Sequence, residues 1–298
     1  MRLCLIGCLS LWMACPAVAE IRLPDSYGRD LVLDSPAQRV VSLAPHITEV
    51  VFAAGAGEQL VGAVSYSDYP KEAAALPRVG SYDRVSYESI AALRPDLVLA
   101  WPSGNGDETI RRLRELGLAV FAYEPRTIED VAQSVRQVGL LTGRSDQADL
   151  AALEFERRLA GLRGQYEGDD TVSVYYQIWN EPLLTLNGDH LISDVVRLCG
   201  GRNVFESAVP MVSHVSIESV IRADPQVVIA SGMDEARPEW LDAWRDWPTM
   251  QAVREDQLYF IPPDILQRHT PRILDGAQQM CEQLQRAREH YKESAADG

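Results

Sequence analysis

The amino-acid sequence predicts an α/β protein with two similar Rossmann-like lobes, each with a mostly parallel sheet, joined by one long rigid helix. The first observation is a duplicated segment, which reads VSYESIAALRPDLVLA at 85–100 and VSIESVIRADPQVVIA at 215–230, with seven of sixteen positions identical. Each copy has the pattern of a short helix, a proline stop and an apolar strand of the kind buried in a parallel sheet. The other two observations are strand and helix patterns that alternate around both copies, and a long helical segment between them.

The first lobe is predicted to span residues 20–144. Its elements are expected in the order hairpin within 20–37, strand 39–43, helix 47–54, strand 60–64, the first copy, helix 108–116, strand 119–123 and helix 128–141. Glycines such as Gly55 and Gly143 are typical of helix ends. Because strands that alternate with helices form mostly parallel sheets with right-handed crossovers, we expect one such sheet in this lobe.

A linking helix is predicted at 145–167, where apolar residues recur at roughly helical spacing with charged residues between them. These apolar residues are Leu150, Leu153, Phe155, Leu159 and Leu162. A helical linker is stiffer than a Gly/Ser hinge, and Gly164 and Gly168 are expected to end it.

The second lobe is predicted to span residues 168–298. Its elements are expected in the order strand 171–178, helix 191–199, the second copy, a tryptophan-rich segment at 240–247, strand 258–261 and helix 271–292. The same alternation therefore predicts a second parallel sheet.

Residues 1–19 have the pattern of a signal peptide. Arg2 is followed by an apolar run from Leu3 to Cys15, which is too short to span a bilayer, and Ala17-Val18-Ala19 is a cleavage site of small residues. The mature chain is expected to begin near Glu20 and to be exported to the periplasm, with no direct insertion into the membrane. A lipoprotein, modified at a cysteine near the N-terminus, is the alternative.

Two cysteines, Cys199 and Cys281, remain after the signal peptide. In an oxidising compartment such a pair is more often a disulfide than two free thiols. We expect a disulfide, with two buried free thiols as the alternative.

Charge and motifs exclude several function classes. A net charge of −15 argues against nucleic-acid binding and against docking on anionic lipid. The sequence has no nucleophile-elbow, phosphate-loop or zinc-protease motif, and its five histidines are scattered. We therefore predict a protein that is not an enzyme, with no resident metal or cofactor; a periplasmic metal-dependent enzyme is the alternative from a different class.

A ligand site is expected where the parallel strands end, because ligands bind at the carboxyl ends of such strands. Pro45, Tyr66, Trp101 and Trp179 lie in loops that follow predicted strands, and His46 lies beside them. Aromatic rings in equivalent places of two lobes favour a large, flat, partly apolar ligand. The alternatives are that the rings only close the ends of the sheets and that His46 lines a wall.

The two copies of the duplicated segment carry an acid at the same place, Glu88 and Glu218. Ser86 and Ser216 precede them as helix N-caps, and an acid in the first turn stabilises a helix through its dipole. Capping explains each glutamate alone. The alternative is a pair of docking charges, one per lobe, on one outer face.

Further motifs lie along residues 38–290. In the first lobe they are Ser42-Leu43-Ala44-Pro45, Thr48-Glu49, Tyr66-Ser67-Asp68-Tyr69-Pro70, Arg94-Pro95-Asp96-Leu97-Val98, Ala100-Trp101 and Gly104-Asn105; in the second they are Cys199-Gly200-Gly201, Asp264, Arg268 and Pro271-Arg272-Ile273. With these motifs the chain resembles the periplasmic cobalamin (vitamin B12)-binding proteins of ABC importers, a branch of the substrate-binding proteins with a helical backbone. Other pieces of the pattern are shared with haem- and siderophore-binding relatives.

The resemblance implies that cobalamin or a related corrinoid is captured in a cleft between the lobes and delivered to a transmembrane permease, with little closure on binding. Cobalamin is then a transported ligand, and the protein is expected to act as a monomer. By matching motif, the ligand contacts include Tyr66, Trp101 and the loop Asp264, Ile265, Leu266, Gln267 and Arg268. Glu88 and Glu218 match glutamates that pair with permease arginines, and Cys199 and Cys281 match a family disulfide. A haem- or ferric-siderophore-binding protein of the same fold is the alternative.

Three positions depart from the family pattern. The loop between Asp264 and Arg268 lacks aromatic residues, Met211 stands where a cleft tryptophan is expected, and His46 stands where a smaller residue is familiar.

Overall fold

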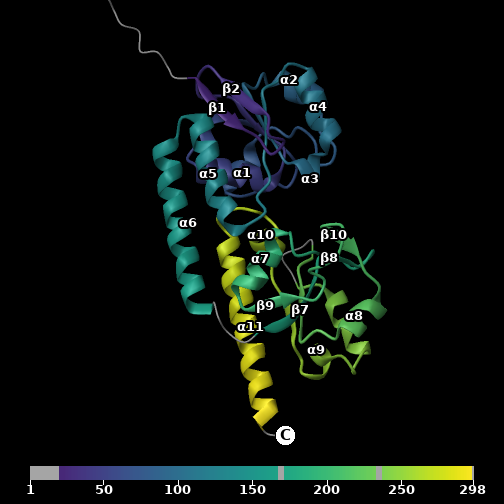
Figure 1. Ribbon diagram of the computed structural model, residues 1–298. Helices are drawn as coiled ribbons and strands as arrows, with labels where there is room; N and C mark the ends of the chain where they lie inside the picture. The colour runs from purple at the N-terminus through teal and green to yellow at the C-terminus, as the bar shows by residue number, and fades with distance from the viewer. Residues whose placement is uncertain (1–19, 167–170, 233–236, 297–298) are drawn as a thin grey trace, which may run out of the picture.

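The two predicted lobes are present in the computed structural model, which describes residues 20–166, 171–232 and 237–296 (Figure 1). The predicted signal peptide lies outside these residues. The N-lobe is built on a parallel sheet of β4 (Leu60–Ala63), β3 (Val40–Ser42), β5 (Leu97–Ala100) and β6 (Val120–Ala122). The C-lobe is built on a parallel sheet of β9 (Gly201–Asn203), β7 (Val172–Gln177), β11 (Val227–Ala230) and β12 (Leu258–Phe260).

The two sheets have the same topology. Numbered along the chain within its own lobe, each sheet has the strand order 2-1-3-4. The apolar strands of the duplicated segment, β5 and β11, occupy the same third place, and all their residues are buried. This agreement confirms the predicted fold class.

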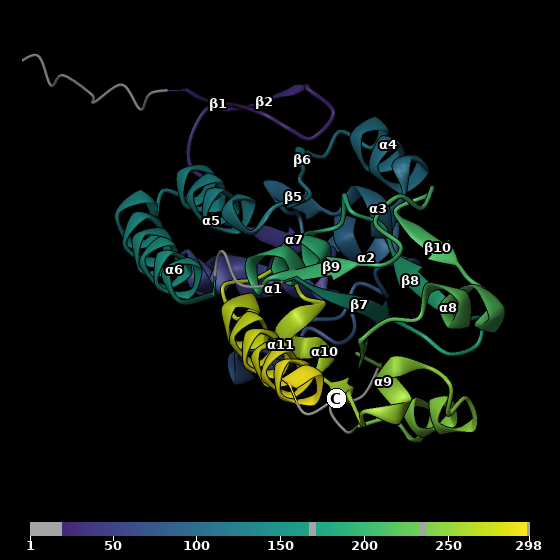
Figure 2. The same cartoon turned by 60° about the horizontal axis from the view of Figure 1, so that its bottom comes forward.

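Helices cover the two sheets. In the N-lobe they are α1 (Pro45–Ala53), α2 (Tyr87–Ala92), α3 (Pro102–Asn105), α4 (Asp107–Glu115) and α5 (Ile128–Thr142). In the C-lobe they are α7 (Leu191–Leu198), α8 (Ile217–Ala223), α9 (Gln251–Arg254), α10 (Pro263–Leu266) and α11 (Ile273–Ala296), with a 3-10 helix at Glu239–Asp246. Viewed from the C-lobe end, α5, α6 (Ser145–Tyr166) and α11 gather on one side of the molecule and α8 lies on the other (Figure 2).

Short antiparallel pairs complete the lobes. The hairpin expected within 20–37 is β1 (Ile21–Pro24) with β2 (Asp30–Leu33). The sequence did not predict β9, nor the pair β8 (Leu184–Leu186) and β10 (Val212–His214). Strands β8, β9 and β10 read LTL, GRN and VSH, so they lack the continuous apolar run that predicted the central strands.

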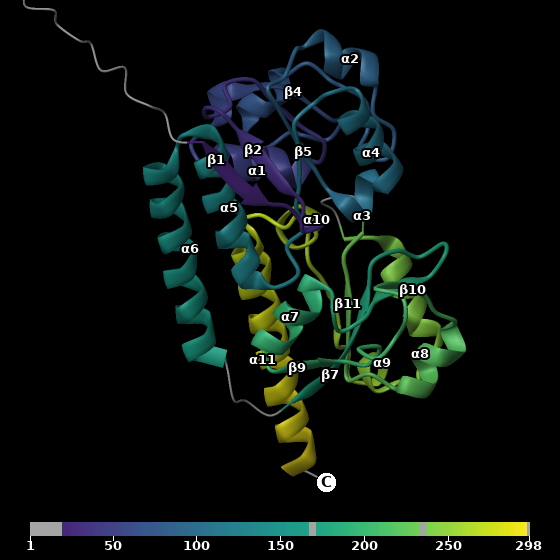
Figure 3. The same cartoon turned by 45° about the horizontal axis from the view of Figure 1, so that its top comes forward.

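The predicted linking helix is α6 (Ser145–Tyr166), which runs along both lobes (Figures 1 and 3). Its first half contributes Ala148 to the N-lobe core, whereas Phe155 and Leu159 belong to the C-lobe core. Because both cores pack on one continuous helix, the link between the lobes is rigid.

Only some of the apolar residues of α6 are buried. Leu150 and Leu153 are 69% and 56% exposed, and the buried stripe is Ala148, Ala152, Phe155 and Leu159. Small residues are used because α5 comes close: a Cβ atom added to Gly139 would lie 2.2 Å from Cβ of Ala148. The helix also continues through Gly164 to Tyr166, and Gly168 lies outside the described residues.

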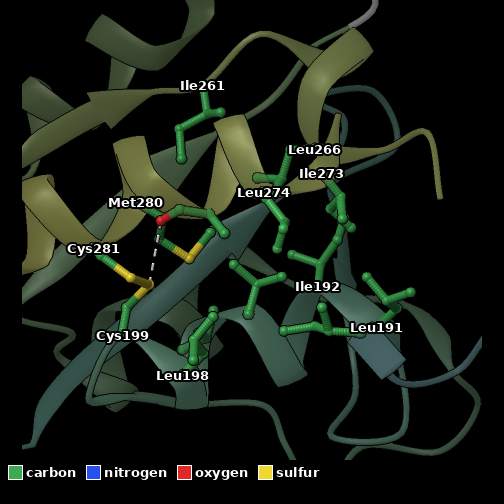
Figure 4. Close-up of a cluster of buried hydrophobic side chains, with 14 of the residues drawn as sticks. Leu191, Ile192, Leu198, Cys199, Ile261, Leu266, Ile273, Leu274, Met280 and Cys281 are labelled. Atoms are coloured by element: carbon green, nitrogen blue, oxygen red, sulfur yellow. Dashed lines mark hydrogen bonds between the residues drawn. A yellow bond between two sulfur atoms is a disulfide. The ribbon is translucent and has the colours of Figure 1, made fainter. Parts of the chain in front are cut away.

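A disulfide joins Cys199, which ends α7, to Cys281 in α11. Both cysteines are fully buried among apolar side chains of the C-lobe core, including Leu198 and Met280 (Figure 4). The expected pairing is therefore present, and it closes a segment of 82 residues.

Candidate ligand-binding cleft

A cavity of about 220 Å³ lies between the lobes. The N-lobe contributes Trp101, Glu124 and Arg126, and the C-lobe contributes Asp189, His190, Met211 and His269. A larger hollow of about 470 Å³ lies beside Gln165 and Gln285. We place the site in the interlobe cavity because it lies at the carboxyl ends of the sheet strands.

Strand order explains why the N-lobe wall contains these residues. In a sheet of order 2-1-3-4, the chain leaves in opposite directions after the first and third strands, which opens a crevice between their ends. His46 follows β3, the first strand, and Trp101 follows β5, the third. Glu124 and Arg126 follow β6 at the same edge.

Trp101 is held on several sides. Its ring Nε1 donates a hydrogen bond to Oε1 of Glu124 at 3.1 Å, and its ring lies 5.8 Å from that of Tyr82 between centroids. The ring covers Gly104, where an added Cβ atom would lie 2.0 Å from Cε3 of the indole. The cavity wall is therefore preformed around a partly buried aromatic face.

Three histidine rings lie in a row at the cavity, each packed against the next. We call His46, His269 and His190 the histidine row. The ring centroids of His46 and His269 lie 5.8 Å apart, and those of His269 and His190 lie 5.4 Å apart. His46 also packs edge-on against Trp101 at 5.0 Å. Since His46 belongs to the N-lobe and the other two to the C-lobe, the row crosses the interface between the lobes.

The histidine row is held in its uncharged form. Burial lowers the pKa of His269 to about 4 and that of His190 to about 3, the latter with a smaller effect from His269. Burial, together with His269 and Arg268, lowers the pKa of His46 well below its usual value. Among the described residues, no group of three or more His, Cys, Asp or Glu side chains is arranged to hold a metal ion.

An ion cluster also joins the lobes, centred on Glu49 of α1. Its Oε1 accepts hydrogen bonds from Nη1 of Arg268 at 2.9 Å and from Nη2 of Arg272 at 2.7 Å, and its Oε2 accepts one from Nε of Arg272 at 2.9 Å. The side chain of Glu49 is only 3% exposed. Arg268 also pairs with Asp68 and Asp264.

Aromatic and electrostatic contacts extend this cluster toward the predicted Tyr66–Pro70 loop. The guanidinium of Arg272 stacks 3.8 Å above the ring of Tyr69. Burial is the largest single influence on the pKa of Asp68 and acts to raise it, but the hydrogen bond and charge of Arg268, with smaller effects of the backbone and Arg272, together outweigh burial, so this pKa lies below its usual value. The loop of the N-lobe is thereby tied to the C-lobe segment between α10 and α11.

The predicted N-lobe contacts differ in whether they line the cavity. Trp101 lines the cavity, and the buried His46 contacts two residues that line it. Pro45 is half-buried at the start of α1. Tyr66 is 75% exposed with a φ of 64°, and it is not part of the cavity wall.

The predicted C-lobe contacts lie mostly outside the cavity. Trp179 donates from Nε1 to the carbonyl oxygen of Glu181 at 2.8 Å, which turns the ring back on its own loop. Leu266 is fully buried in the C-lobe core, and Ile265 packs against that core. Gln267 donates to the carbonyl oxygen of Ser231 at 2.5 Å.

The two glutamates of the duplicated segment occupy equivalent places. Glu88 and Glu218 are exposed in the first turns of α2 and α8, and the serine before each accepts a hydrogen bond from the backbone three residues on. The interaction with Ser216 and the backbone lowers the pKa of Glu218. Both helices lie on the side of the molecule away from α6 (Figure 3).

Several residues at the cleft were not predicted as site residues. Glu124 and Arg126 follow β6, so the same strand-end rule would have found them if it had been applied to polar residues. His190 and His269 carried no such signal, because nothing in their spacing shows that they meet.

Two sheets of identical order, bridged by α6 and enclosing a cavity at their strand ends, define a two-lobed solute-binding protein. A family model described as periplasmic binding protein matches residues 40–265. The chain belongs to this family. Within the described residues, no helix combines the length and apolar character needed to cross a bilayer.

The relatives narrow the resemblance further. The vitamin B12-binding protein of Vibrio cholerae serotype O1 is 37% identical over 250 residues, which cover 84% of this chain and 90% of that protein. The crystal structure of the periplasmic vitamin B12 binding protein BtuF of Vibrio cholerae superposes with a TM-score of 0.78 over 85% of this chain and 98% of that one, at 37% identity. The periplasmic heme-binding protein RhuT from Roseiflexus sp. RS-1 superposes with a TM-score of 0.73 at 22% identity over 85% of this chain and 99% of that one, which shows a shared fold.

Proposed function

We propose that this protein captures cobalamin, or a related corrinoid, in the interlobe cleft and delivers it to the permease of an ABC importer. The observation that carries the proposal is the 37% identity to a vitamin B12-binding protein over 84% of the chain. The aromatic-walled cavity between two lobes fits this function. No chemistry on the ligand is included in the proposal.

Location forms part of the proposal. The pattern of residues 1–19 supports export through a cleavable signal peptide, and the relatives belong to a periplasmic family. We propose that the mature protein is a monomer in the periplasm. We also propose the domain limits predicted from the sequence, with lobes at 20–144 and 168–298 joined by a linking helix at 145–167.

Affinity is expected to come from burial of the ligand between preformed walls. The cavity of about 220 Å³ is smaller than the 300–1,000 Å³ typical of pockets for drug-sized ligands, so a corrinoid must extend beyond it into the open cleft. We therefore propose contacts both inside and outside the cavity. They are Pro45, His46, Tyr66, Trp101, Trp179 and the segment Asp264, Ile265, Leu266, Gln267 and Arg268, in which the fully buried Leu266 anchors the segment in the C-lobe core.

Titration with cyanocobalamin tests the proposal directly. We expect saturable one-to-one binding by calorimetry, with the absorption bands of a corrinoid in the purified complex. Haem or a ferric siderophore would give different bands, so the same spectrum distinguishes the alternative ligands. Absence of binding to every corrinoid tested would overturn the proposal.

We also propose that Glu88 and Glu218 dock the protein on the permease, one from each lobe. Both acids are exposed and hold the same place in equivalent helices. A Glu88→Ala, Glu218→Ala variant should bind cyanocobalamin normally but fail to support its uptake through a reconstituted permease. Glu154→Ala on α6, an exposed acid on the other side of the molecule, is the matched control. Normal uptake by the double variant would exclude the docking role.

A further inference from the structure

The histidine row has hydrogen-bonding atoms that no residue in the described part of the chain pairs with. Nε2 of His46 and Nδ1 of His269 are fully buried and have no hydrogen-bond partner among the described residues. The residues themselves are only 5% and 6% exposed. A buried polar atom without a partner costs free energy, so each such atom in a native structure needs an explanation, and a water or ligand that supplies the hydrogen bond is one.

A backbone hydrogen bond to His190 shows which of its ring nitrogens is a donor. Its Nδ1 accepts a hydrogen bond from the backbone N–H of Ile192 at 3.1 Å. In a neutral imidazole the other nitrogen then carries the proton, so Nε2 of His190 is a donor. Because His190 and His269 both line the cavity, the C-lobe wall offers imidazole donors and acceptors close together.

The charges around the histidine row limit which chemical groups of a ligand can bind beside it. The three rings are uncharged at neutral pH, since burial lowers the pKa of each. Glu124 and Asp189 also line the cavity. Of the nearby cations, Arg268 is engaged by Glu49, Asp68 and Asp264, and Arg126 is exposed at the rim.

A primary carboxamide fits these conditions better than a carboxylate. The carboxamide has N–H donors and a carbonyl acceptor and is neutral, which matches a neutral imidazole that has one donor and one acceptor. A carboxylate only accepts, so it leaves imidazole acceptors unpaired, and it places its charge near the half-buried carboxylate of Glu124.

We propose that the histidine row is a subsite for a peripheral carboxamide of the bound ligand, and that it selects amide-bearing ligands against carboxylate-bearing ones. This inference rests on the proposed function, since it concerns the same cleft. It assigns His269 the central contact, because His269 lines the cavity and touches both other rings. A mismatched buried group costs about 10- to 100-fold in affinity.

The test compares cyanocobalamin with its monocarboxylic acid derivatives, in each of which one peripheral carboxamide is hydrolysed. By calorimetry at pH 7.5, we expect the native protein to bind cyanocobalamin at least about tenfold more tightly than at least one of these acids. His269→Leu should bind cyanocobalamin more weakly and lose this preference. His269→Gln, which restores a donor and an acceptor, should recover most of it, as a purely structural role would not. His214→Leu, at an exposed site on β10, is the matched control.

The outcomes separate the two proposals. Equal affinity of the native protein for cyanocobalamin and for all the monocarboxylic acids overturns the carboxamide subsite but leaves the proposed function intact, and this comparison needs no variant. Retention of the preference by a folded His269→Leu variant overturns the subsite as well. Absence of binding to any corrinoid overturns the proposed function and, with it, this inference.

Discussion

The ion cluster between the lobes makes a specific prediction for the variant Glu49→Gln. This substitution keeps the size of the side chain but removes its charge and turns one acceptor oxygen into an amide donor. Arg272 donates to both oxygens of Glu49, at 2.9 and 2.7 Å, so it loses one of these two hydrogen bonds and the negative charge of its partner. It keeps one hydrogen bond to the amide oxygen and its stacking on Tyr69.

The size of the effect follows from burial. Removal of one partner from a buried ion pair costs about 3–5 kcal/mol, because it leaves an uncompensated buried charge. Arg272 is 21% exposed and Arg268 is 14% exposed, and Arg268 retains Asp68 and Asp264. We therefore expect the lower end of the range, a loss of about 3 kcal/mol in the free energy of unfolding.

Urea unfolding followed by fluorescence measures this loss as a lower midpoint with an unchanged slope. Glu154→Gln is the control, because it removes the same charge from an exposed pair with Arg157 and should not change the midpoint measurably. A double variant Glu49→Gln, Arg272→Gln should be more stable than the sum of its two single changes predicts.

Two results would refute this reasoning. One is a loss below about 1 kcal/mol for Glu49→Gln, the range of surface pairs. The other is strict additivity in the double variant, which would mean that Glu49 and Arg272 do not interact in solution.

Three further predictions concern the disulfide, the cavity wall and acid stability. Replacement of Cys199 and Cys281 by alanine should lower the free energy of unfolding by about 4 kcal/mol in the chain-entropy model, since the bond closes 82 residues, and should make unfolding insensitive to reductant. Trp101→Ala should weaken cyanocobalamin binding about tenfold by calorimetry, whereas Trp247→Ala, outside the cavity wall, should not. Between pH 6.5 and 5 the unfolded chain binds a proton at His269 that the folded protein excludes, because the folded pKa is about 4, so this residue alone should lower the free energy of unfolding by about 1.6 kcal/mol over this range. The lowered pKa values of His46 and His190 act in the same direction, so urea titrations of the native protein should show a larger fall, and His269→Leu a smaller fall than the native protein.

The sequence was sufficient for the fold where side chains are buried on every side. The strands β5 and β11 are apolar throughout because both faces of a parallel sheet are covered, and their duplication revealed the common topology of the lobes. The short strands β8 and β10 depend instead on pairing across more than twenty residues. The buried face of α6 depends on Gly139 of another helix, so the spacing that predicted this helix does not show which of its apolar residues are buried.

The cleft was predictable in position but not in chemistry. Strand ends correctly indicated where Trp101 and His46 would lie, because topology alone fixes that edge of the sheet. The partners of His46 and Glu49 lie more than two hundred residues away along the chain. A single histidine or glutamate carries no periodicity, so only the folded structure shows that the histidine row and the ion cluster exist.

The ion cluster and the histidine row have different roles at the interface between the lobes. The ion cluster satisfies its own charges, which holds α1 of the N-lobe against Arg268 and Arg272 of the C-lobe. The histidine row lies beside the ion cluster, and two of its ring nitrogens have no hydrogen-bond partner among the described residues. Since α6 and the shared packing already fix the lobes, a ligand that supplies the missing hydrogen bonds gains them without ordering the protein first. Glu49 therefore holds the lobes together before the ligand binds, and the ligand supplies the remaining hydrogen bonds. This arrangement favours binding in a preformed cleft over binding by closure of the lobes.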